Sequence, residues 1–423
     1  MAYRLSSLTF VRSLAPALAY VYYLDMASKK DTIPRLHQLV PHMRTQLIGL
    51  RDGATFEKAR QRYIETVNRL EAEGRGRKTA SRVGDRDAYW SPTAEALEEA
   101  MRLELVVRQP LPSARRYLDA HRESLFVLTD LGQEAADLAE KNPAAFFDQL
   151  SKSVIRAHPY FRRLLDLLKE APLLCPEVSE GDIEASRKSG RGTDYWAEWA
   201  TEKINQGPFS PGATVEDIKE DMTAVRRRFG KKPTERPTSK ALSEAINDAF
   251  AAASLRSRGL PIGATDLLVL KKWGSQLLLL DESRYVPSYA GSNLLWIAAD
   301  IEWQGDDLSI ARRGLSNYGR KVAQAIVEAY RTQAHATEST LAAPYLSIYK
   351  VRAEVAFATG VTRALVDRTL EQLAAGGFDD LGVQVYLHLG RGDQPPRSEP
   401  PYRRGGSRRY ELTMTDQQER SNG

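Results

Sequence analysis

The chain has 423 residues, a length that accommodates about two to four domains with separate cores. Its hydrophobic content of 42% and charged content of 27% are ordinary for a soluble globular protein. Cys175 is the single cysteine, which excludes an intramolecular disulfide framework and a cysteine-based zinc site, and indicates a reducing, cytoplasmic environment.

The net charge of +5 is distributed unevenly along the chain. Residues 75–86 hold five basic side chains against one acidic side chain, and residues 226–236 hold six against one. Residues 391–409 hold six arginines against two acidic side chains. Such clusters are typical of phosphate-binding surfaces, and solvated linkers show them as well.

The N-terminal region, residues 1–75, is predicted to be helical, with helices at about 8–25, 32–49 and 55–73. The uncharged run at 13–24 is too short to cross a bilayer, which takes about 20 apolar residues. A secretory signal has a run of this length, so it stays an alternative to a buried first helix. We expect no membrane partner.

A basic break follows at residues 74–87 and contains Arg75, Arg77 and Lys78. The order Gly-Arg-Gly-Arg-Lys-Thr resembles a phosphate-binding loop, but Arg77 stands where that loop needs glycine, and a predicted helix precedes it. We therefore reject a nucleotide-binding loop. The break stays a candidate for DNA-phosphate contacts, with a solvated turn as the alternative.

The next pattern consists of a helix at 94–103, apolar residues at 105–107, a polar loop, a strand at 125–129 and a helix from Leu131. This order resembles the second half of bacterial winged-helix domains, in which the wing varies and a Leu-Thr-x-x-Gly sequence closes the domain. Glu104 stands where such domains carry glycine after the helix. The resemblance implies DNA contact or dimerisation for this segment.

Residues 141–260 are predicted to be helical, most clearly at 146–168, with a loop-rich insertion at 172–211 and a basic linker at 226–237. No fold is assigned to the stretch that follows. Its apolar runs at 277–280 and 294–299 are buried strands or helix cores, which periodicity does not separate, and residues 310–333 indicate one long helix or two shorter ones.

A series of helices and strands closes the chain between about 344 and 415. Its predicted elements are a helix at 347–358, a break at 359–361, a helix at 363–375, a strand at 383–389 and a strand at 410–414. Thr362 is placed to cap the second helix, whose apolar face includes Val366 and Leu373. The order resembles a winged-helix domain of the helix-turn-helix superfamily, with residues 391–409 as the wing.

This resemblance implies that the second helix and the wing contact DNA. On the helix, Thr362, Arg363 and Arg368 lie off the apolar face and are candidates to read base edges or neutralise phosphates. Asp367 opposes that role, because a carboxylate repels phosphate. The wing is the stronger electrostatic element, and its candidate arginines are Arg391, Arg397, Arg403, Arg404, Arg408 and Arg409.

The predicted fold is mainly α, with two winged-helix domains that carry small β wings and are joined by a helical middle region. The resemblance covers those two domains and not the chain as a whole. The predicted regions are an N-terminal helical region (1–88), a winged-helix-like segment (89–140), a helical middle region (141–260), a helical or mixed α/β region (261–340), a C-terminal winged-helix domain (341–416) and a tail (417–423).

We predict a non-enzymatic, cytoplasmic protein that binds double-stranded DNA, mainly through backbone contacts of the wing. Its length favours a homo-oligomer or a subunit of a bacterial assembly for DNA processing, genome maintenance, DNA condensation or antiviral defence. An alternative is a kleisin-like winged-helix scaffold with little DNA affinity, because winged helices also mediate protein–protein interaction. We expect no cofactor and no metal.

A second alternative is a metal-dependent nuclease, for which Asp281 and Asp300 are the best available carboxylates. No lysine follows them at the spacing that such a site needs, so solvent-facing strand ends are the competing interpretation. Trp196 and Trp199 are candidates to stack a base, and core positions of a helix are the alternative.

Overall fold

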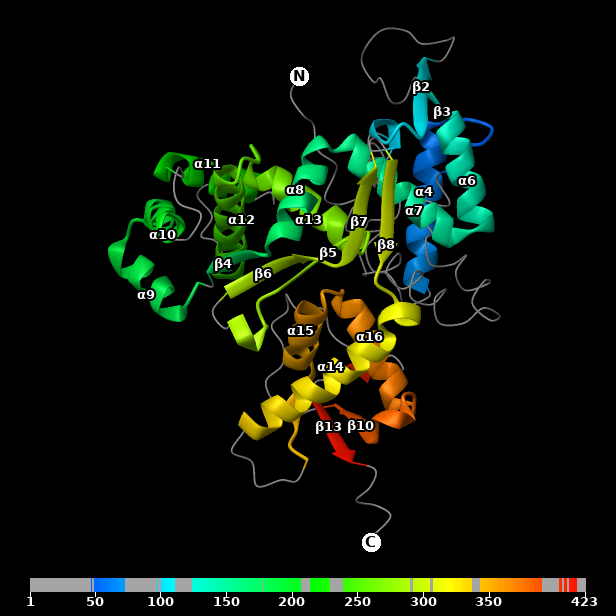
Figure 1. Cartoon of the computed structure of the whole chain (residues 1–423). Coiled ribbons are helices and arrows are strands. Elements are labelled where there is room, and N and C mark those ends of the chain that lie inside the picture. The colour runs from blue at the N-terminus through cyan, green and yellow to red at the C-terminus, as the bar shows by residue number, and fades with distance from the viewer. Residues whose placement is uncertain are drawn as a thin grey trace. The chain divides into compact units, whose positions relative to one another are not determined.

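The protein is mostly helical over the residues that the structure describes, with small antiparallel sheets between the helices (Figure 1). The predicted mainly α fold is confirmed at this level. The computed structural model describes residues 47, 49–72, 97, 100–110, 124–176, 178–206, 214–228, 239–289, 292–304, 307–336, 343–389, 403–404, 407–408 and 411–416.

The chain divides into two compact units, residues 1–162 with 269–277 and residues 163–268 with 278–423. In the first unit, the predicted helix at 55–73 is confirmed, whereas the predicted helix at 8–25 lies outside the described residues. The elements of this unit are β1 (Ala54–Thr55), α4 (Phe56–Ala72), helical residues at 97 and 100–102, β2 (Val106–Pro110), β3 (Ser124–Leu128), α6 (Asp130–Lys141) and α7 (Pro143–Ala157).

β3 is the central strand of a three-stranded antiparallel sheet with the order β1-β3-β2. Its Phe126 pairs with Ala54 on one side and with Arg108 on the other. Outside the sheet, Arg51 forms an ion pair of 2.6 Å with Asp137 and so ties the chain before β1 to α6. The core of this unit is built from buried apolar side chains of the strands and helices, among them Ala54, Phe56, Ala59, Leu105, Val106, Phe126, Ala135 and Ala136.

A tight turn at residues 103–105, the step, joins the helical residues 100–102 to β2. Glu104 occupies the position in this step where glycine is usual. Glu104 has a φ of +60°, the left-handed conformation that disfavours a side chain. The step is held by two hydrogen bonds: the Leu105 N–H donates to the Ala100 carbonyl at 2.9 Å, and the Thr129 hydroxyl donates to the Glu104 carbonyl at 2.6 Å. These contacts stabilise the backbone against the local strain.

The Leu-Thr-x-x-Gly sequence, residues 128–132, contacts the same step. The Thr129 hydroxyl caps α6 by accepting from the Gly132 N–H at 2.9 Å. A Cβ on Gly132 would lie 1.9 Å from the Leu105 carbonyl oxygen, so only glycine allows this approach of α6 to the chain before β2. The sequence pattern is therefore a packing requirement.

The predicted continuous segment at 146–168 is two helices. α7 ends at Ala157, and α8 (Pro159–Glu170) begins at a proline, which has no N–H with which to continue α7.

The prediction of a basic linker at 226–237 is wrong in part, because α11 (Val215–Arg228) continues to Arg228.

The predicted loop-rich insertion at 172–211 is wrong, because regular elements occupy most of it. A capping box starts α9, in which Ser179 accepts from the Asp182 N–H and the Asp182 carboxylate accepts from the Ser179 N–H. Trp196 is fully buried, as the core interpretation predicted, and the Trp199 indole donates to Asp182 at 3.1 Å. The elements here are β4 (Leu173–Pro176), α9 (Glu180–Ser189) and α10 (Thr193–Asn205), which packs with α11 and α12 (Ser239–Ser257).

The stretch that follows is mixed α/β, as one of the two predictions for 261–340 had it. After α13 (Ala264–Gln276), β5 (Leu280–Ser283) and β6 (Ser292–Ile297) join β4 in an antiparallel sheet of order β4-β6-β5. β7 (Ala299–Gln304) and β8 (Asp307–Arg312) form a hairpin. The predicted helix at 310–333 is α14 (Leu315–Ala336), because residues 310–312 still belong to β8.

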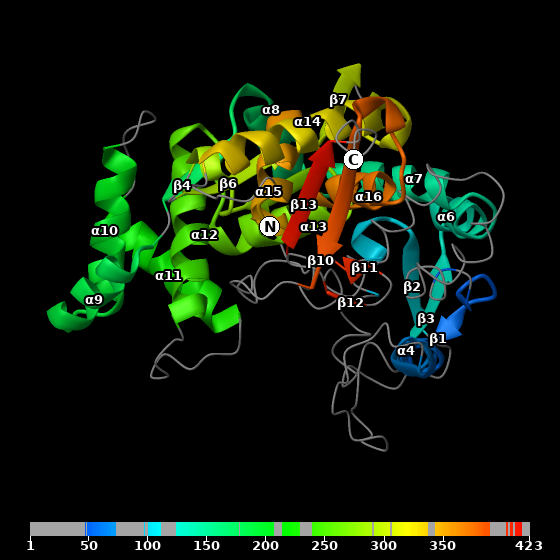
Figure 2. The same ribbon diagram turned by 90° about the horizontal axis from the view of Figure 1, so that it is seen from below.

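The C-terminal elements match the predicted series closely. Figure 2 looks onto β10 and β13, which run side by side in a sheet of order β10-β13-β9. The three helices of this part pack on one another, and α16 also packs on β10. The elements after α14 are β9 (Leu346–Ser347), α15 (Ile348–Thr359), α16 (Arg363–Ala374), β10 (Val383–His388), β11 (Arg403–Arg404), β12 (Ser407–Arg408) and β13 (Glu411–Asp416).

Candidate nucleic-acid interface

A glycine turn separates α15 from α16. Gly360 ends α15 with a φ of +64°, and the N–H of Val361 donates back to the Ala356 carbonyl at 2.9 Å. The Gly360 carbonyl in turn accepts from the Arg313 guanidinium, which also binds Asp300 at 2.6 Å. The left-handed conformation favours glycine here, and a Cβ on Gly360 would also lie 2.3 Å from Arg313 Nη1, so the guanidinium would have to shift.

The N-terminus of α16 is capped by a carboxylate from β5. Asp281 Oδ2 accepts from the backbone N–H of Arg363 at 2.6 Å, and Asp281 Oδ1 accepts from the Arg363 guanidinium at 2.8 Å. The two side chains are only 8% and 13% exposed. Thr362 occupies the N-cap position but makes no side-chain capping bond, so the expected cap is supplied by Asp281.

β6 and the residues before it cover the same turn. The Trp296 indole N–H donates to the Val361 carbonyl at 3.0 Å in a buried hydrogen bond, and its ring meets Phe357 edge to face at 5.7 Å. Ser288 donates from both its N–H and its hydroxyl to the carboxylate of Glu354 on α15. The turn between α15 and α16 is therefore packed within the chain.

All four ionisable side chains of α16 are in ion pairs. Besides Arg363, Arg368 binds Glu371 at 2.6 Å, and Asp367 accepts from the buried Arg352 at 3.2 Å. The apolar face is buried as predicted, with Val366, Leu370 and Leu373 at most 1% exposed. This helix therefore offers DNA little uncompensated positive charge.

The wing between β10 and β13 contains a second, small hairpin. β11 and β12 pair antiparallel, with Arg403 opposite Arg408 and Arg404 opposite Ser407. The backbone thus brings the two arginines to directly facing register positions. Of the predicted DNA-binding residues, Arg391, Arg397 and Arg409 in the wing and Arg75, Arg77 and Lys78 in the basic break lie outside the described residues.

Two residues that sequence reasoning missed lie on the outer face of the C-terminal sheet. The rings of Tyr345 and His388 meet edge to face with centroids 4.8 Å apart. The alternation of buried and less buried residues along β10 places His388 on the outer face, and this signal was available in the sequence. Tyr345 has no comparable signal, because it precedes a strand of only two residues.

The carboxylates considered for a nuclease are committed to arginines. Asp281 binds Arg363, and Asp300 binds Arg313. Asp281 is also buried, so the interpretation as a solvent-facing strand end is wrong for it. Within the described ranges, no three histidine, cysteine, aspartate or glutamate side chains come together as a group able to hold a metal ion.

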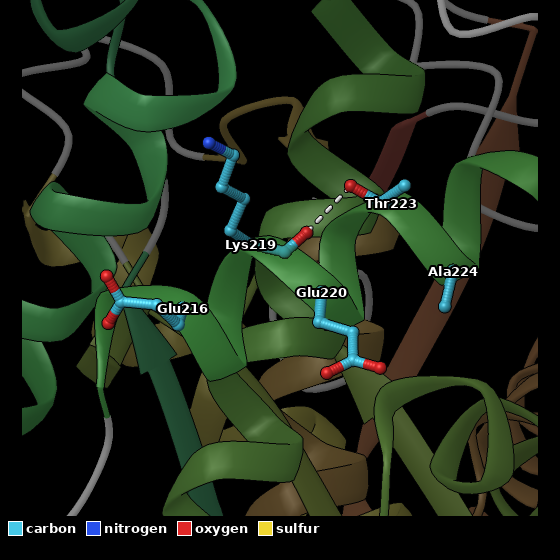
Figure 3. A pocket seen from close by; sticks show the side chains of 5 residues that line it. All are labelled: Glu216, Lys219, Glu220, Thr223 and Ala224. Carbon is cyan, nitrogen blue, oxygen red and sulfur yellow. Dashed lines mark hydrogen bonds between the residues drawn. The ribbon is translucent and has the colours of Figure 1, made fainter.

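A shallow hollow of about 360 Å³ lies along α11 (Figure 3). Its charged lining consists of Glu216, Glu220 and Lys219, and the ammonium of Lys219 already binds Asp194 of α10 at 2.5 Å. The remaining lining comes from Thr223 and Ala224. The excess of carboxylates repels phosphate, so this hollow does not add to a nucleic-acid site.

No protein-family model, curated protein or solved structure matches the chain. Among the helices that the structure describes, none combines the length and apolar character needed to cross a membrane.

Proposed function

We propose that the protein binds double-stranded DNA and that the wing between β10 and β13 makes the main contacts, through phosphates rather than bases. We also infer that the segments containing the β1-β3-β2 and β10-β13-β9 sheets are winged helices. In each, a strand comes before the helices, and the last strand lies at the centre of the sheet: β3 between β1 and β2, and β13 between β10 and β9.

The observation that carries this proposal is the facing pair Arg403 and Arg408 in the β11–β12 hairpin. The backbone register of this hairpin concentrates arginine positions at one place in the chain, and such a concentration of basic residues suits a polyanionic ligand. The hairpin lies in a stretch, 391–409, with a net charge of +4 from six arginines against two acidic residues. DNA backbone is the polyanion that suits such a loop, and backbone contacts bring weak sequence specificity.

The state of α16 supports the emphasis on phosphates. Base reading needs the N-terminal residues of a recognition helix in the major groove. Here Arg363 is held by Asp281, Thr362 is only 4% exposed, and Arg368 is paired with Glu371. The wing arginines remain the better candidates for contact.

A salt titration of duplex binding by the full chain tests the proposal. The triple variant Arg403→Ala, Arg404→Ala, Arg408→Ala is expected to reduce the magnitude of the negative slope of log affinity against log salt by about 2 to 3. Each phosphate contact contributes about 0.9 to this magnitude. The control variant Arg187→Ala, Lys188→Ala, Arg191→Ala removes the same charge at the end of α9 and is expected to leave the slope unchanged. Absent or salt-independent binding, or equal effects of the two variants, contradicts the proposal.

A second candidate function is an interaction subunit of a larger DNA-processing, genome-maintenance or defence assembly. It is favoured by the helix-turn-helix turn, whose Val361 carbonyl is bound by Trp296 and whose helix is capped by Asp281. Under this alternative the purified chain binds duplex weakly even at low salt, is insensitive to the wing variant, and co-purifies with a partner at fixed stoichiometry. The cytoplasm stays the predicted compartment, on the evidence of the single cysteine.

A further inference from the structure

The outer face of the β10-β13-β9 sheet carries an aromatic surface. The inward positions Leu412, Met414 and Val385 are buried, and the alternation along the strands places the intervening positions on the outer face. Among the large apolar side chains that are exposed in the described part of the chain, Tyr345, just before β9, has one of the two greatest exposed fractions, 55%.

This surface is ordered by its neighbours. The Tyr345 ring meets the His388 ring at 4.8 Å and 61°, and His388 Nε2 is 3.0 Å from the Thr413 hydroxyl. Thr413 belongs to the central strand between the two and is only 7% exposed. On the other side of Tyr345, the buried Tyr330 hydroxyl donates to the Pro344 carbonyl at 2.8 Å, which fixes the backbone just before the ring. A ring held in place while half exposed loses little conformational entropy when a ligand stacks on it.

The arginine hairpin is close to this surface along the chain. Glu411 of β13 pairs with His388 of β10. Arg408 precedes Glu411 by three residues, so their Cα atoms are at most about 11 Å apart. Aromatic rings close along the chain to arginines suit unpaired nucleotides, because bases stack on rings while cations hold phosphates.

We propose that Tyr345 and His388 stack an unpaired base, so that the preferred ligand is DNA with a single-stranded segment beside the duplex. The inference rests on the proposed function, since the wing holds the backbone of the same strand. A protein partner would use the apolar area of Tyr345 and would not need an aromatic ring. This difference separates the two occupants.

The experiment compares blunt duplex with the same duplex carrying an overhang of about ten nucleotides, which suits the site sizes of single-strand binders. A fluorescent adenine analogue in the overhang reports stacking by quenching. Full-chain Tyr345→Ala and Tyr345→Leu are expected to bind the overhang substrate about 5- to 100-fold more weakly and to lose the quenching. Blunt-duplex affinity is expected to be unchanged, and Tyr345→Phe is expected to behave as the parent protein.

Tyr289→Ala serves as the matched control, because Tyr289 is a half-exposed tyrosine in a similar edge-to-face contact, with Phe357 at 5.2 Å. If the parent protein binds both substrates equally, or if Tyr345→Leu retains quenching, base stacking is wrong. Equal losses on blunt duplex would show a structural effect and also reject it.

The two proposals fail in different ways. If wing-dependent duplex binding is present without an overhang preference, the stacking proposal falls and the proposed function stands. If overhang binding is present and insensitive to the wing variant, the proposed function falls and the stacking proposal stands. If the parent protein binds neither substrate, both are rejected.

Discussion

The carboxylate of Asp281 holds Arg363 twice, once by its backbone N–H at 2.6 Å and once by its guanidinium at 2.8 Å. The pair joins β5 to the first residue of α16 across 82 positions of sequence. Both groups are nearly buried, so neither exchanges its partner for water at low cost. This contact fixes the N-terminus of α16 against β5.

Asp281→Ala is expected to destabilise the second unit by about 3–5 kcal/mol, because it removes the carboxylate that binds a buried guanidinium and caps α16. Urea unfolding followed by circular dichroism measures the effect. The double variant Asp281→Leu, Arg363→Met is expected to recover most of the loss, since it removes both charges. Asp300→Ala, whose carboxylate is half exposed, is the control and is expected to lose about 1 kcal/mol or less. Equal losses for Asp281→Ala and Asp300→Ala would rule out a special role for the buried pair.

Glu104→Gly is expected to raise the stability of the first unit by about 0.5–1 kcal/mol. The residue has a φ of +60°, which glycine adopts without the steric penalty of a Cβ. Glu104→Ala keeps the Cβ and is the control, expected to show no gain. Thermal unfolding resolves the two variants, and a stability gain shared by both would point to the lost carboxylate instead of the backbone.

Gly132→Ala is expected to destabilise the first unit by about 1–3 kcal/mol, the range for an overpacked site. The added methyl group would lie 1.9 Å from the Leu105 carbonyl oxygen, so α6 or the chain before β2 has to move. Gly190→Ala is a useful comparison, because Gly190 has open space around it and only its φ of +69° resists substitution. Gly132→Ala unfolding like the parent protein in urea would show that the close approach is not required.

Asp182 is expected to make the helical part of the second unit sensitive to acid. Burial raises the pKa of this carboxyl, but hydrogen bonds from Ser179 and the Trp199 indole outweigh it, so the pKa lies below its ordinary value of 3.8. A lowered pKa means that the stabilisation is complete above about pH 4 and is lost as pH falls through the folded-state pKa. Asp182→Ala is expected to cost about 1 kcal/mol at neutral pH, as for a lost cap. The difference from the parent protein shrinks below pH 4, and a constant difference down to about pH 2 would contradict the assignment.

Local signals in the sequence predicted the C-terminal elements well. Gly360 and Thr362 mark the turn, and the spacing of Val366, Leu370 and Leu373 gives the buried face of α16. The strands at 383–389 and 410–414 follow from alternation, and both were found within two residues of their predicted ends. Periodicity is decisive where one face of an element is buried and the other is not.

The incorrect predictions have a common physical cause: local sequence patterns do not reveal contacts with residues far away along the chain. The segment at 172–211 is polar and rich in glycine, yet Trp196 buries its ring and α10 packs on α11 and α12. Likewise, nothing near Arg363 in sequence indicates that Asp281 will neutralise it. Arg363 and Thr362 looked suited to DNA because their tertiary partners lie far away along the chain.

The contacts of Asp281, Trp296 and Arg313 with the turn at 360–363 bear on how the chain can be divided. A C-terminal piece cut near residue 340 would lose the cap of α16, the indole that binds Val361 and the guanidinium that binds Gly360. The C-terminal elements therefore depend on contacts with residues that precede position 340. Any excision, fusion or exchange of these elements has to include residues 278–313.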